Sequence, residues 1–146
     1  MVTFRQATPN DIPTLIKFDR EAQSKRYTAY LTVGEWLKEM SESTVYIFED
    51  DSVPIGMFSV QEKTPDHIYF AGFVVGLQYR GRGYARQAMC YFLSMYSNAR
   101  RIDLVTHPQN SNAIMLYLKS GFFIEAWKEN FYGDGEPRIV MARVKI

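Results

Sequence analysis

The sequence predicts an α/β protein in which helices flank a central mixed sheet. Strand-like runs of β-branched and aromatic residues alternate with segments whose apolar residues recur every three to four positions, as on one face of a helix. Capping signals precede two of the helical segments, and a glycine-rich turn joins an apolar strand to a third. Together these observations predict about seven strands and about four helices in a single domain over residues 1–146.

Two capping pairs mark helix starts in the first third of the chain. Residues 3–7 form the first predicted strand, after which Thr8 and Asp11 form an N-cap and its acidic partner. Thr32 and Glu35 open a second helix in the same way. The apolar residues that these two helices carry are Ile12, Leu15, Ile16, Trp36, Leu37 and Met40.

The other strands follow along the rest of the chain. Six further segments have the β-branched and aromatic composition of strands, and they span residues 44–49, 55–61, 68–75, 102–106, 122–131 and 137–144. Residues 50–52 form the turn between the first two of these strands. A short helix is expected over residues 113–120, and Gly133 and Gly135 mark the turn of a closing hairpin.

Composition bounds the class of protein. Hydrophobic residues make up 47% of the chain, enough for a packed core, so disorder is not expected. A formal net charge of +1 argues against general binding to nucleic acid or to a membrane. Cys90 is the only cysteine and is expected to be packed and inert; with no signal peptide or long apolar run, a cytoplasmic protein is expected. His67 and His107 lack the spacing of metal ligands, so no metal is expected.

A glycine-rich turn follows the apolar strand at residues 68–75 and leads into a helix. That helix is indicated by apolar residues on one face, namely Ala85, Ala88, Met89, Phe92, Leu93 and Tyr96. Free amides and the positive end of the helix dipole meet at such a turn, and together they attract phosphate. We therefore expect the turn to hold a phosphorylated ligand. Its residues are Arg80, Gly81, Arg82, Gly83, Tyr84 and Ala85.

Two familiar phosphate-binding motifs fit this turn poorly. The P-loop requires G-x-x-x-x-G-K-[ST], a spacing that the chain lacks. The dinucleotide fingerprint fits in part, because Gly81 and Gly83 are present, but Arg86 occupies the third small position. Asp103 stands about 20 residues on, yet at the start of a predicted strand and not at its end, where a ribose-binding acid is expected.

A third motif matches the turn more closely. Arg80, Gly83 and Ala85 align with [Q/R]-x-x-G-x-[G/A] and so resemble the pyrophosphate signature of the GNAT superfamily, the acetyl-CoA-dependent N-acyltransferases. For the hexapeptide alone, an ordinary strand-loop-helix connection with surface arginines remains open. About 30 residues downstream, residues 110–122 resemble a second GNAT segment, N-x-x-A-[IV]-x-L-Y-x-x-x-G-F. The matching residues are Asn110, Ala113, Ile114, Leu116, Tyr117, Gly121 and Phe122.

With both motifs the chain is identified as a member of the GNAT superfamily, and the resemblance covers nearly all of it. It implies a mostly antiparallel central sheet that is splayed at the cofactor site. It also implies transfer of the acetyl group of acetyl-CoA to a primary amine, by direct attack in a ternary complex. A non-catalytic acyl-CoA-binding or regulatory module is the alternative, favoured if Tyr117 lacks access to the thioester. Many relatives pair as dimers, which makes a homodimer a further expectation.

The same resemblance assigns residues to acetyl-CoA. The amides of residues 80–85 would hold the pyrophosphate, and Arg82 would contact the outer phosphates. The strand before the turn would pair through its backbone with the pantetheine amides, as an added strand does. Those strand positions are Phe73, Val74 and Val75. Gly72 is consistent with a local break in the strand, and Asn110 matches the family position near the pantetheine arm.

Tyr117 matches the tyrosine that many family members use as the general acid toward the CoA sulfur. A thiol has a pKa of ~8.5 and a tyrosine ~10, so the hydroxyl stays protonated at neutral pH and can donate. Relatives often place a glutamate base on the strand before the turn, but Tyr69 occupies one such position here. His67 lies two residues earlier on the same face, and its pKa range suits a base. A plain surface histidine, a water chain, or an acceptor that arrives deprotonated are the alternatives.

The family pattern places the acceptor between the first two helices and the final hairpin. Aromatic and acidic side chains in these regions suit a cationic amine. They are accompanied by one arginine, and the set is Glu21, Arg26, Tyr27, Tyr30, Trp36, Tyr132, Asp134 and Glu136. Residues 130–136 are similar to the tail of N-acetyltransferases that act on protein N-termini. A peptide N-terminus or a small amine is therefore expected, with a preference for an α-amine, whose pKa of ~7.7–8.0 demands less of a base than the ~10.4 of an alkylamine.

Overall fold

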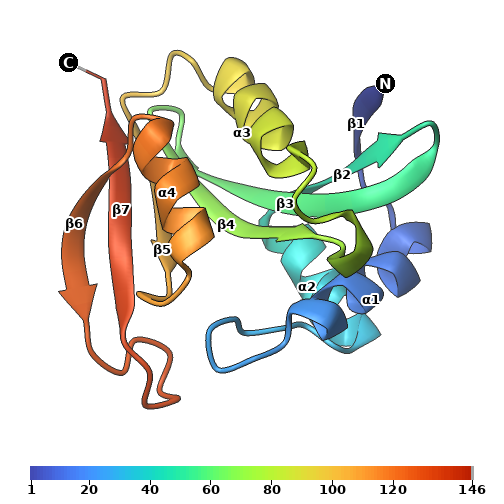
Figure 1. The fold of residues 1–146 in the computed structure, drawn as a ribbon, viewed down its shortest axis with the longest axis horizontal. Helices are drawn as coiled ribbons and strands as arrows, with labels where there is room; N and C mark the ends of the chain where they lie inside the picture. The colour runs from blue at the N-terminus through green and yellow to red at the C-terminus, as the bar shows by residue number, and fades with distance from the viewer. Residues whose placement is uncertain (146) are drawn as a thin grey trace.

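The computed structural model describes residues 1–145. In this part of the chain seven strands form one sheet in the order β1-β2-β3-β4-β5-β7-β6, flanked by four α-helices (Figure 1). The strands are β1 (Val2–Gln6), β2 (Thr44–Asp50), β3 (Val53–Thr64), β4 (His67–Val75), β5 (Arg101–Thr106), β6 (Phe123–Lys128) and β7 (Arg138–Val144). The helices are α1 (Ile12–Ala22), α2 (Val33–Glu42), α3 (Tyr84–Met95) and α4 (Ser111–Lys119), with 3-10 turns η1 (Pro9–Asp11) and η2 (Leu77–Tyr79). Among the strands of residues 1–145, only β4 and β5 pair in parallel, so the predicted mixed, mostly antiparallel sheet is confirmed.

The sheet separates two apolar cores, because successive residues of a strand point to opposite faces. Phe58 of β3 packs with Phe92 in the core beneath α3 and α4. Its neighbour Met57 belongs to the second core, with Leu15 of α1 and Trp36 of α2. Figure 1 accordingly places α1 and α2 together, apart from α3 and α4. The apolar residues whose spacing predicted the elements therefore pack into a core on each face of the sheet.

Helix α2 buries a carboxylate and exposes a leucine. Its start is as predicted, since Thr32 Oγ1 accepts a hydrogen bond from the Glu35 N–H at 3.1 Å. Its buried residues are Trp36 and Glu39, which lie three positions apart on one face. Leu37, by contrast, is 47% exposed. An acidic side chain on the inner face of a helix is rare unless it is paired or has a role there.

Two smaller expectations are corrected by the structure. Thr8 and Asp11 cap the short turn η1, and α1 starts only after it. Cys90 is exposed and not packed, because the buried face of α3 runs through Met89 and Phe92 and leaves Cys90 beside it.

The connection between β6 and β7 is longer than the predicted hairpin turn. Strand β6 ends at Lys128, and residues 129–137 form a loop before β7. Asn130 adopts a positive φ of 49°, and its Oδ1 accepts a hydrogen bond from the Gly135 N–H at 2.6 Å. This side-chain contact closes a loop that is wider than a two-residue turn, and it carries Tyr132, Asp134 and Glu136 away from the sheet.

The pairing between β4 and β5 is short, and this opens a wedge in the sheet. The two strands pair over residues 67–69 only. Beyond Tyr69, β4 pairs with β3 alone, while β5 pairs with β7. The register of β3 and β4 shifts so that Ala71 has no partner, which puts the break expected at Gly72 on the adjacent residue. The splay implied by the family resemblance is therefore present.

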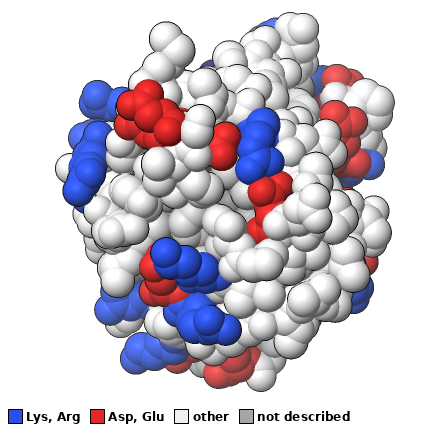
Figure 2. Space-filling view, turned by 90° about the vertical axis from the view of Figure 1, so that its right-hand side faces the viewer, with Lys and Arg blue, Asp and Glu red and all other residues white. Residues whose placement is uncertain are grey.

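Charge is mixed on the face that Figure 2 presents, where basic and acidic side chains are interspersed among uncharged ones. Within residues 1–145, no helix has the length and apolar composition needed to cross a membrane. The same residues hold no group of three or more His, Cys, Asp or Glu side chains suited to a metal ion.

Candidate active site

The turn between β4 and α3 leaves open space above its backbone. Gly81 and Gly83 have φ values of 77° and 82°, a left-handed conformation that glycine adopts without strain. A Cβ atom added at either position would meet no other atom within 4 Å. Gly83 is also the N-cap of α3, and no side chain of residues 1–145 caps that helix start. Amides at the positive end of the helix dipole therefore face a space that suits a phosphate group.

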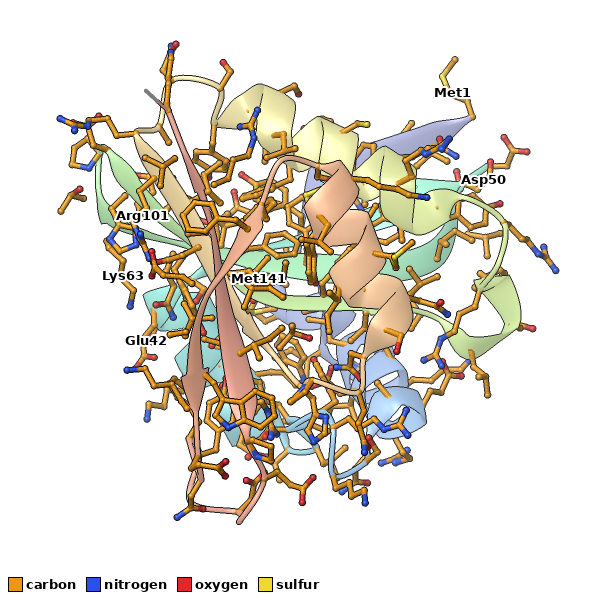
Figure 3. All side chains as sticks on the ribbon, turned by 60° about the vertical axis from the view of Figure 1, so that its left-hand side comes forward. Met1, Glu42, Asp50, Lys63, Arg101 and Met141 are labelled. Atoms are coloured by element: carbon orange, nitrogen blue, oxygen red, sulfur yellow. The ribbon has the colours of Figure 1, made fainter. Side chains whose placement is uncertain are left out.

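Two side chains of this turn hold it in place. Arg80 Nε donates a hydrogen bond to the Val75 carbonyl at 3.1 Å. The Tyr84 hydroxyl donates a hydrogen bond to Asp50 Oδ2 at 2.6 Å. Asp50 is the last residue of β2 and is labelled in Figure 3. Arg82 is exposed. The arrangement suits binding by the turn's backbone, with Arg82 available for further phosphates.

Strand β4 leaves one backbone edge unpaired along the wedge. Phe73, Val74 and Val75 pair with β3 but have no strand on their other side. Their side chains are used in packing: Val74 is 4% exposed in the core beneath α1 and α2, and Phe73 and Val75 pack against the opposite core. Main-chain groups therefore border the wedge, where an extended ligand with amide groups can pair as an added strand.

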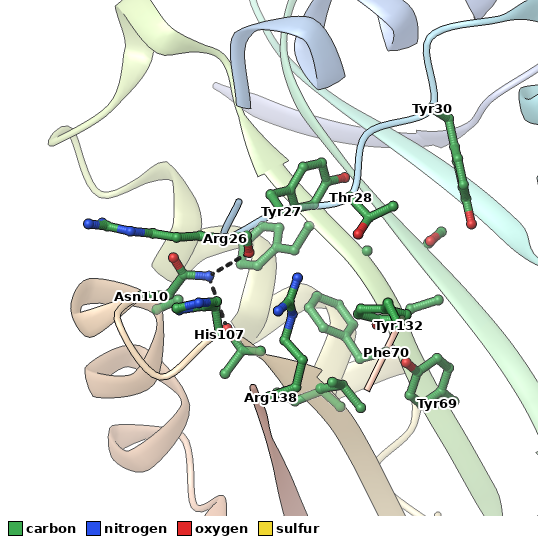
Figure 4. A pocket seen from close by; sticks show the side chains of 18 of the residues that line it. Arg26, Tyr27, Thr28, Tyr30, Tyr69, Phe70, His107, Asn110, Tyr132 and Arg138 are labelled. Atoms are coloured by element: carbon green, nitrogen blue, oxygen red, sulfur yellow. Dashed lines mark hydrogen bonds between the residues drawn. The ribbon is translucent and has the colours of Figure 1, made fainter. Parts of the chain in front are cut away.

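A cavity of about 310 Å³ occupies this wedge (Figure 4). Its walls come from β3, residues 69–73 of β4, the end of β5, the start of β7, helices α2 and α4, the loop of residues 23–32 between α1 and α2, and the β6–β7 loop. Tyr117 lines it and belongs to the core beneath α3 and α4, whereas Trp36 lines it and belongs to the core beneath α1 and α2. The cavity therefore joins the two faces of the sheet.

Tyr117, the predicted acid, lies on α4 at this junction. It is 6% exposed and packs with Phe70 and Phe122, whose ring centroids lie 6.5 and 5.9 Å from its own. Burial raises the pKa of Tyr117 above the ordinary tyrosine value. The hydroxyl therefore stays protonated at neutral pH, as a proton donor requires.

Asn110 also lines the cavity, at the start of α4. Its side chain does not cap the helix but bridges to neighbouring segments. Asn110 Nδ2 donates to Thr106 Oγ1 at 3.3 Å and to the Arg26 carbonyl at 3.4 Å. This residue thus ties the wall formed by α4 to the loop between α1 and α2 (Figure 4).

His67, the predicted base, is not among the residues that line the cavity. Its Nε2 lies 2.9 Å from Asp103 Oδ2, which also accepts a hydrogen bond from Arg101 Nε at 2.9 Å. Arg101 in turn makes two hydrogen bonds to Glu125 across the sheet. Tyr69, at the position where relatives often carry a glutamate, does line the cavity.

The residues expected around the acceptor divide into two groups. The cavity is lined by Arg26, Tyr27, Tyr30, Trp36 and Tyr132. Glu21 lies elsewhere, with its Oε1 accepting from the Leu77 N–H at 3.0 Å. Asp134 and Glu136 lie in the β6–β7 loop and contact the cavity through buried partners that sequence reasoning did not assign to the site.

One of these partners is His107, which is 2% exposed and lines the cavity. Its Nδ1 accepts from the Gln109 N–H at 3.0 Å, and because a backbone amide can only donate, the ring proton must sit on Nε2. Nε2 then donates to Glu136 Oε1 at 2.8 Å. Both ring nitrogens are thus engaged, and the pair anchors the β6–β7 loop to the end of β5.

The other is Arg138, also 2% exposed and on the cavity wall. Its guanidinium donates to Asp134 Oδ2 at 3.2 Å and to the Pro137 carbonyl at 3.0 Å. It also lies over the Tyr132 ring, 5.1 Å from the centroid. These partners compensate the positive charge of Arg138, as a buried charge requires.

The loop between α1 and α2 is held by a buried acid. Asp19 is 0% exposed and accepts from the Tyr27 hydroxyl at 2.9 Å and from the Tyr30 N–H at 2.7 Å. Trp36 Nε1 donates to the Tyr30 carbonyl at 3.1 Å. Burial raises the pKa of Asp19 to about 6, although both hydrogen bonds favour the ionised form. The acid thus orders the aromatic wall of the cavity.

Residues 11–122 match the model of the Acetyltransferase (GNAT) family. The chain belongs to this family. It is 31% identical over 153 residues to the N-alpha-acetyltransferase of Sulfurisphaera tokodaii, covering 94% of this chain and 90% of that one. The family identifies the chain as an acetyltransferase, and members of this family use acetyl-CoA.

Solved structures of the family have the same fold. Ard1 from Thermoplasma volcanium superimposes with a TM-score of 0.83 at 24% identity, covering 99% of this chain and 98% of that one. A GNAT family acetyltransferase from Elizabethkingia anophelis with acetyl-CoA bound gives a TM-score of 0.77 at 15% identity, covering 99% and 98%.

Proposed function

We propose that this acetyltransferase transfers the acetyl group of acetyl-CoA to the α-amine of a peptide or protein N-terminus, by direct attack in a ternary complex. The observation that carries the proposal is the cavity through the wedge between β4 and β5. It brings Tyr117 on one face of the sheet together with an aromatic, charged chamber on the other. A donor and an acceptor can therefore meet inside it while each is held by a different face.

The donor side fits acetyl-CoA through its backbone. The open turn at Gly81 and Gly83 would receive the pyrophosphate, and Arg82 the outer phosphates. The unpaired edge of β4 at residues 73–75 would pair with the pantetheine amides. Asn110 lies on the cavity wall where the arm would pass. With these contacts the thioester would lie near the break at Ala71.

Tyr117 would act as the general acid. As the nitrogen of the acceptor forms its bond to the acetyl carbon, the carbon–sulfur bond breaks, and the Tyr117 hydroxyl gives its proton to the departing sulfur. Main-chain N–H groups at the break in β4 would stabilise the negative charge that develops on the thioester oxygen. Tyr117 lines the cavity, which supports its access to the thioester and so favours the catalytic function over a non-catalytic acyl-CoA-binding module.

The amine must lose a proton as well. His67 lies outside the cavity wall, so it could serve as the base only through intervening water. An α-amine, with a pKa of ~7.7–8.0, is partly neutral at pH 7 without such help, whereas an alkylamine at ~10.4 is almost fully protonated. The family relative that is an N-alpha-acetyltransferase supports the same choice of acceptor.

Acetylation of matched acceptors, followed as thiol release at pH 7, tests the proposal. The set contains a peptide with a free α-amine, the same peptide with its N-terminus blocked and one internal lysine, and spermidine. We expect the free α-amine to exceed the blocked peptide in kcat/KM by about a hundredfold or more, from the difference in neutral fraction. A higher kcat/KM for the blocked peptide or for spermidine would replace the α-amine with a side-chain or small-molecule amine.

A further inference from the structure

Glu39 is a buried carboxylate that has no role in the proposed transfer step. It lies on the inner face of α2, is 7% exposed, and lines the cavity. Among residues 1–145 no hydrogen bond or ion pair holds it, and its oxygens are not sealed from solvent as Asp103 Oδ1 is. Because burying a carboxylate without compensation is costly, a partner for Glu39 is expected in the cavity that it lines.

Aromatic side chains line the cavity together with this carboxylate. Trp36 lies three residues earlier on the same face of α2, and Tyr30 packs edge-on against it with ring centroids 5.6 Å apart. Burial, and after it the charge of Glu39, raises the pKa of Tyr30. The pKa of Tyr69 is raised by burial first and, to a smaller extent, by the charge of Glu39. A carboxylate among electron-rich rings is the usual composition of a site for an organic cation.

Two arginines line the cavity, and neither pairs with Glu39 within residues 1–145. The side chain of Arg26 points away from Tyr30 (Figure 4). Arg138 donates a hydrogen bond to Asp134 and lies over the ring of Tyr132. The charge of Arg138 is therefore compensated by partners other than Glu39. Tyr132 in turn lies next to Tyr69, whose pKa is raised by burial and by the Tyr132 hydroxyl. Lys63 lies outside, 5.3 Å from the centroid of the Tyr69 ring.

We propose that Glu39, with the rings of Tyr30 and Tyr69, forms a subsite for a second, non-reacting positive charge of the acceptor. Resting on the proposed function, this means a lysine or arginine side chain at one of the first two residues of the acceptor peptide. The reacting amine itself does not belong there. It must be neutral to attack, and a carboxylate next to it would favour the protonated form. Glu39 also lies on α2, across the sheet from Tyr117.

Two peptide series test the subsite, each varying one of the first two residues among lysine, glutamine and glutamate. In the wild type we expect kcat/KM to be about tenfold higher for lysine than for glutamine at one of these positions, and lower still for glutamate. Glu39→Gln keeps the shape of the side chain and should remove this preference by raising KM for the lysine peptide alone. Glu42→Gln, an exposed acid on the same helix, is the matched control and should leave the preference intact.

Three results would overturn the inference. One is equal kcat/KM for lysine and glutamine peptides in the wild type, which leaves N-terminal acetylation itself standing. Another is a fall in kcat for every peptide in Glu39→Gln with an altered pH profile, which would make Glu39 a proton acceptor. If no peptide is acetylated the proposed function fails, and calorimetry with the N-acetylated lysine and glutamine peptides still decides whether Glu39 binds the cation. Equal affinities would then reject the subsite.

Discussion

The two halves of the proposed site are built in different ways. The proposed donor half uses main chain, at the turn and along the strand edge beside the cavity: the amides after Gly83, the open backbone at Gly81 and the unpaired edge of β4. The proposed acceptor half uses side chains on the cavity wall that come from distant elements, with Glu39 on α2 and Arg138 on β7. A backbone site needs a particular run of consecutive residues and leaves a motif in the sequence. A side-chain site needs only that the fold bring its members together, and it leaves none.

The largest expected effect tests the backbone character of the donor half. Gly83→Asp places a negative side chain where the pyrophosphate would lie, and we expect it to abolish measurable acetyl-CoA binding by calorimetry. Gly83→Asn is the matched control, because asparagine tolerates the same φ of 82° and has the same size without the charge. Comparable, near wild-type affinity in both folded variants would show that phosphate does not bind at this turn.

The next effect concerns the point where the two halves meet. Tyr117→Phe keeps the ring in its packing against Phe70 and Phe122 but removes the proton offered to sulfur. We expect turnover to fall by about 10²–10⁴, with acetyl-CoA affinity little changed. Single-turnover measurement isolates the chemical step. A wild-type rate there would assign the proton to another group or to water.

The smallest effect tests whether the acceptor half depends on its buried acid. Burial raises the pKa of Asp19 from 3.8 to about 6, so between those values the folded protein binds a proton that the unfolded chain has lost. Asp19 therefore lowers stability progressively as pH rises from about 4 to about 6, by on the order of 2–3 kcal/mol in all. Asp19→Asn lacks this titration, so its stability relative to wild type should increase across the same window.

Urea denaturation at several pH values between 4 and 7 measures that difference. Asp66→Asn, at an exposed position, is the control and should show no such trend. The exchange at Asp19 also disturbs the contacts to Tyr27 and Tyr30, so acceptor KM should rise while acetyl-CoA affinity holds. A difference in stability between the two proteins that stays constant with pH would mean that burial does not raise the pKa of Asp19.

The fold was largely predictable because each element carries its own local signal. Strand composition, the Thr32 and Glu35 capping pair and the face of α3 all agree with the sheet they build. The long β6–β7 loop was missed because Asn130 closes it through a side-chain contact to Gly135, which no local pattern announces. The exposure of Cys90 shows the same limit, since a residue beside a buried stripe can lie on either side of its boundary.

The candidate site was predictable only where it follows the chain. The turn and Tyr117 belong to contiguous motifs, and the structure brings Tyr117 and Asn110 to one cavity. His107 and Arg138 depend on partners 29 and four residues away, in a loop whose course could not be foreseen. The burial of Glu39 could have been predicted from the sequence, because it lies three positions after Trp36 on the apolar face of α2.

Because residues of both cores line the cavity, the proposed donor and acceptor would approach it from different sides of the sheet. Under the proposed function, a folded protein that offers its N-terminus would cover the side beneath α1 and α2. The spent coenzyme, lying along β4 toward the α3 turn, would then keep a separate exit. A bulky client would not have to depart before a fresh donor arrives, and the size of the client would set no limit on coenzyme exchange.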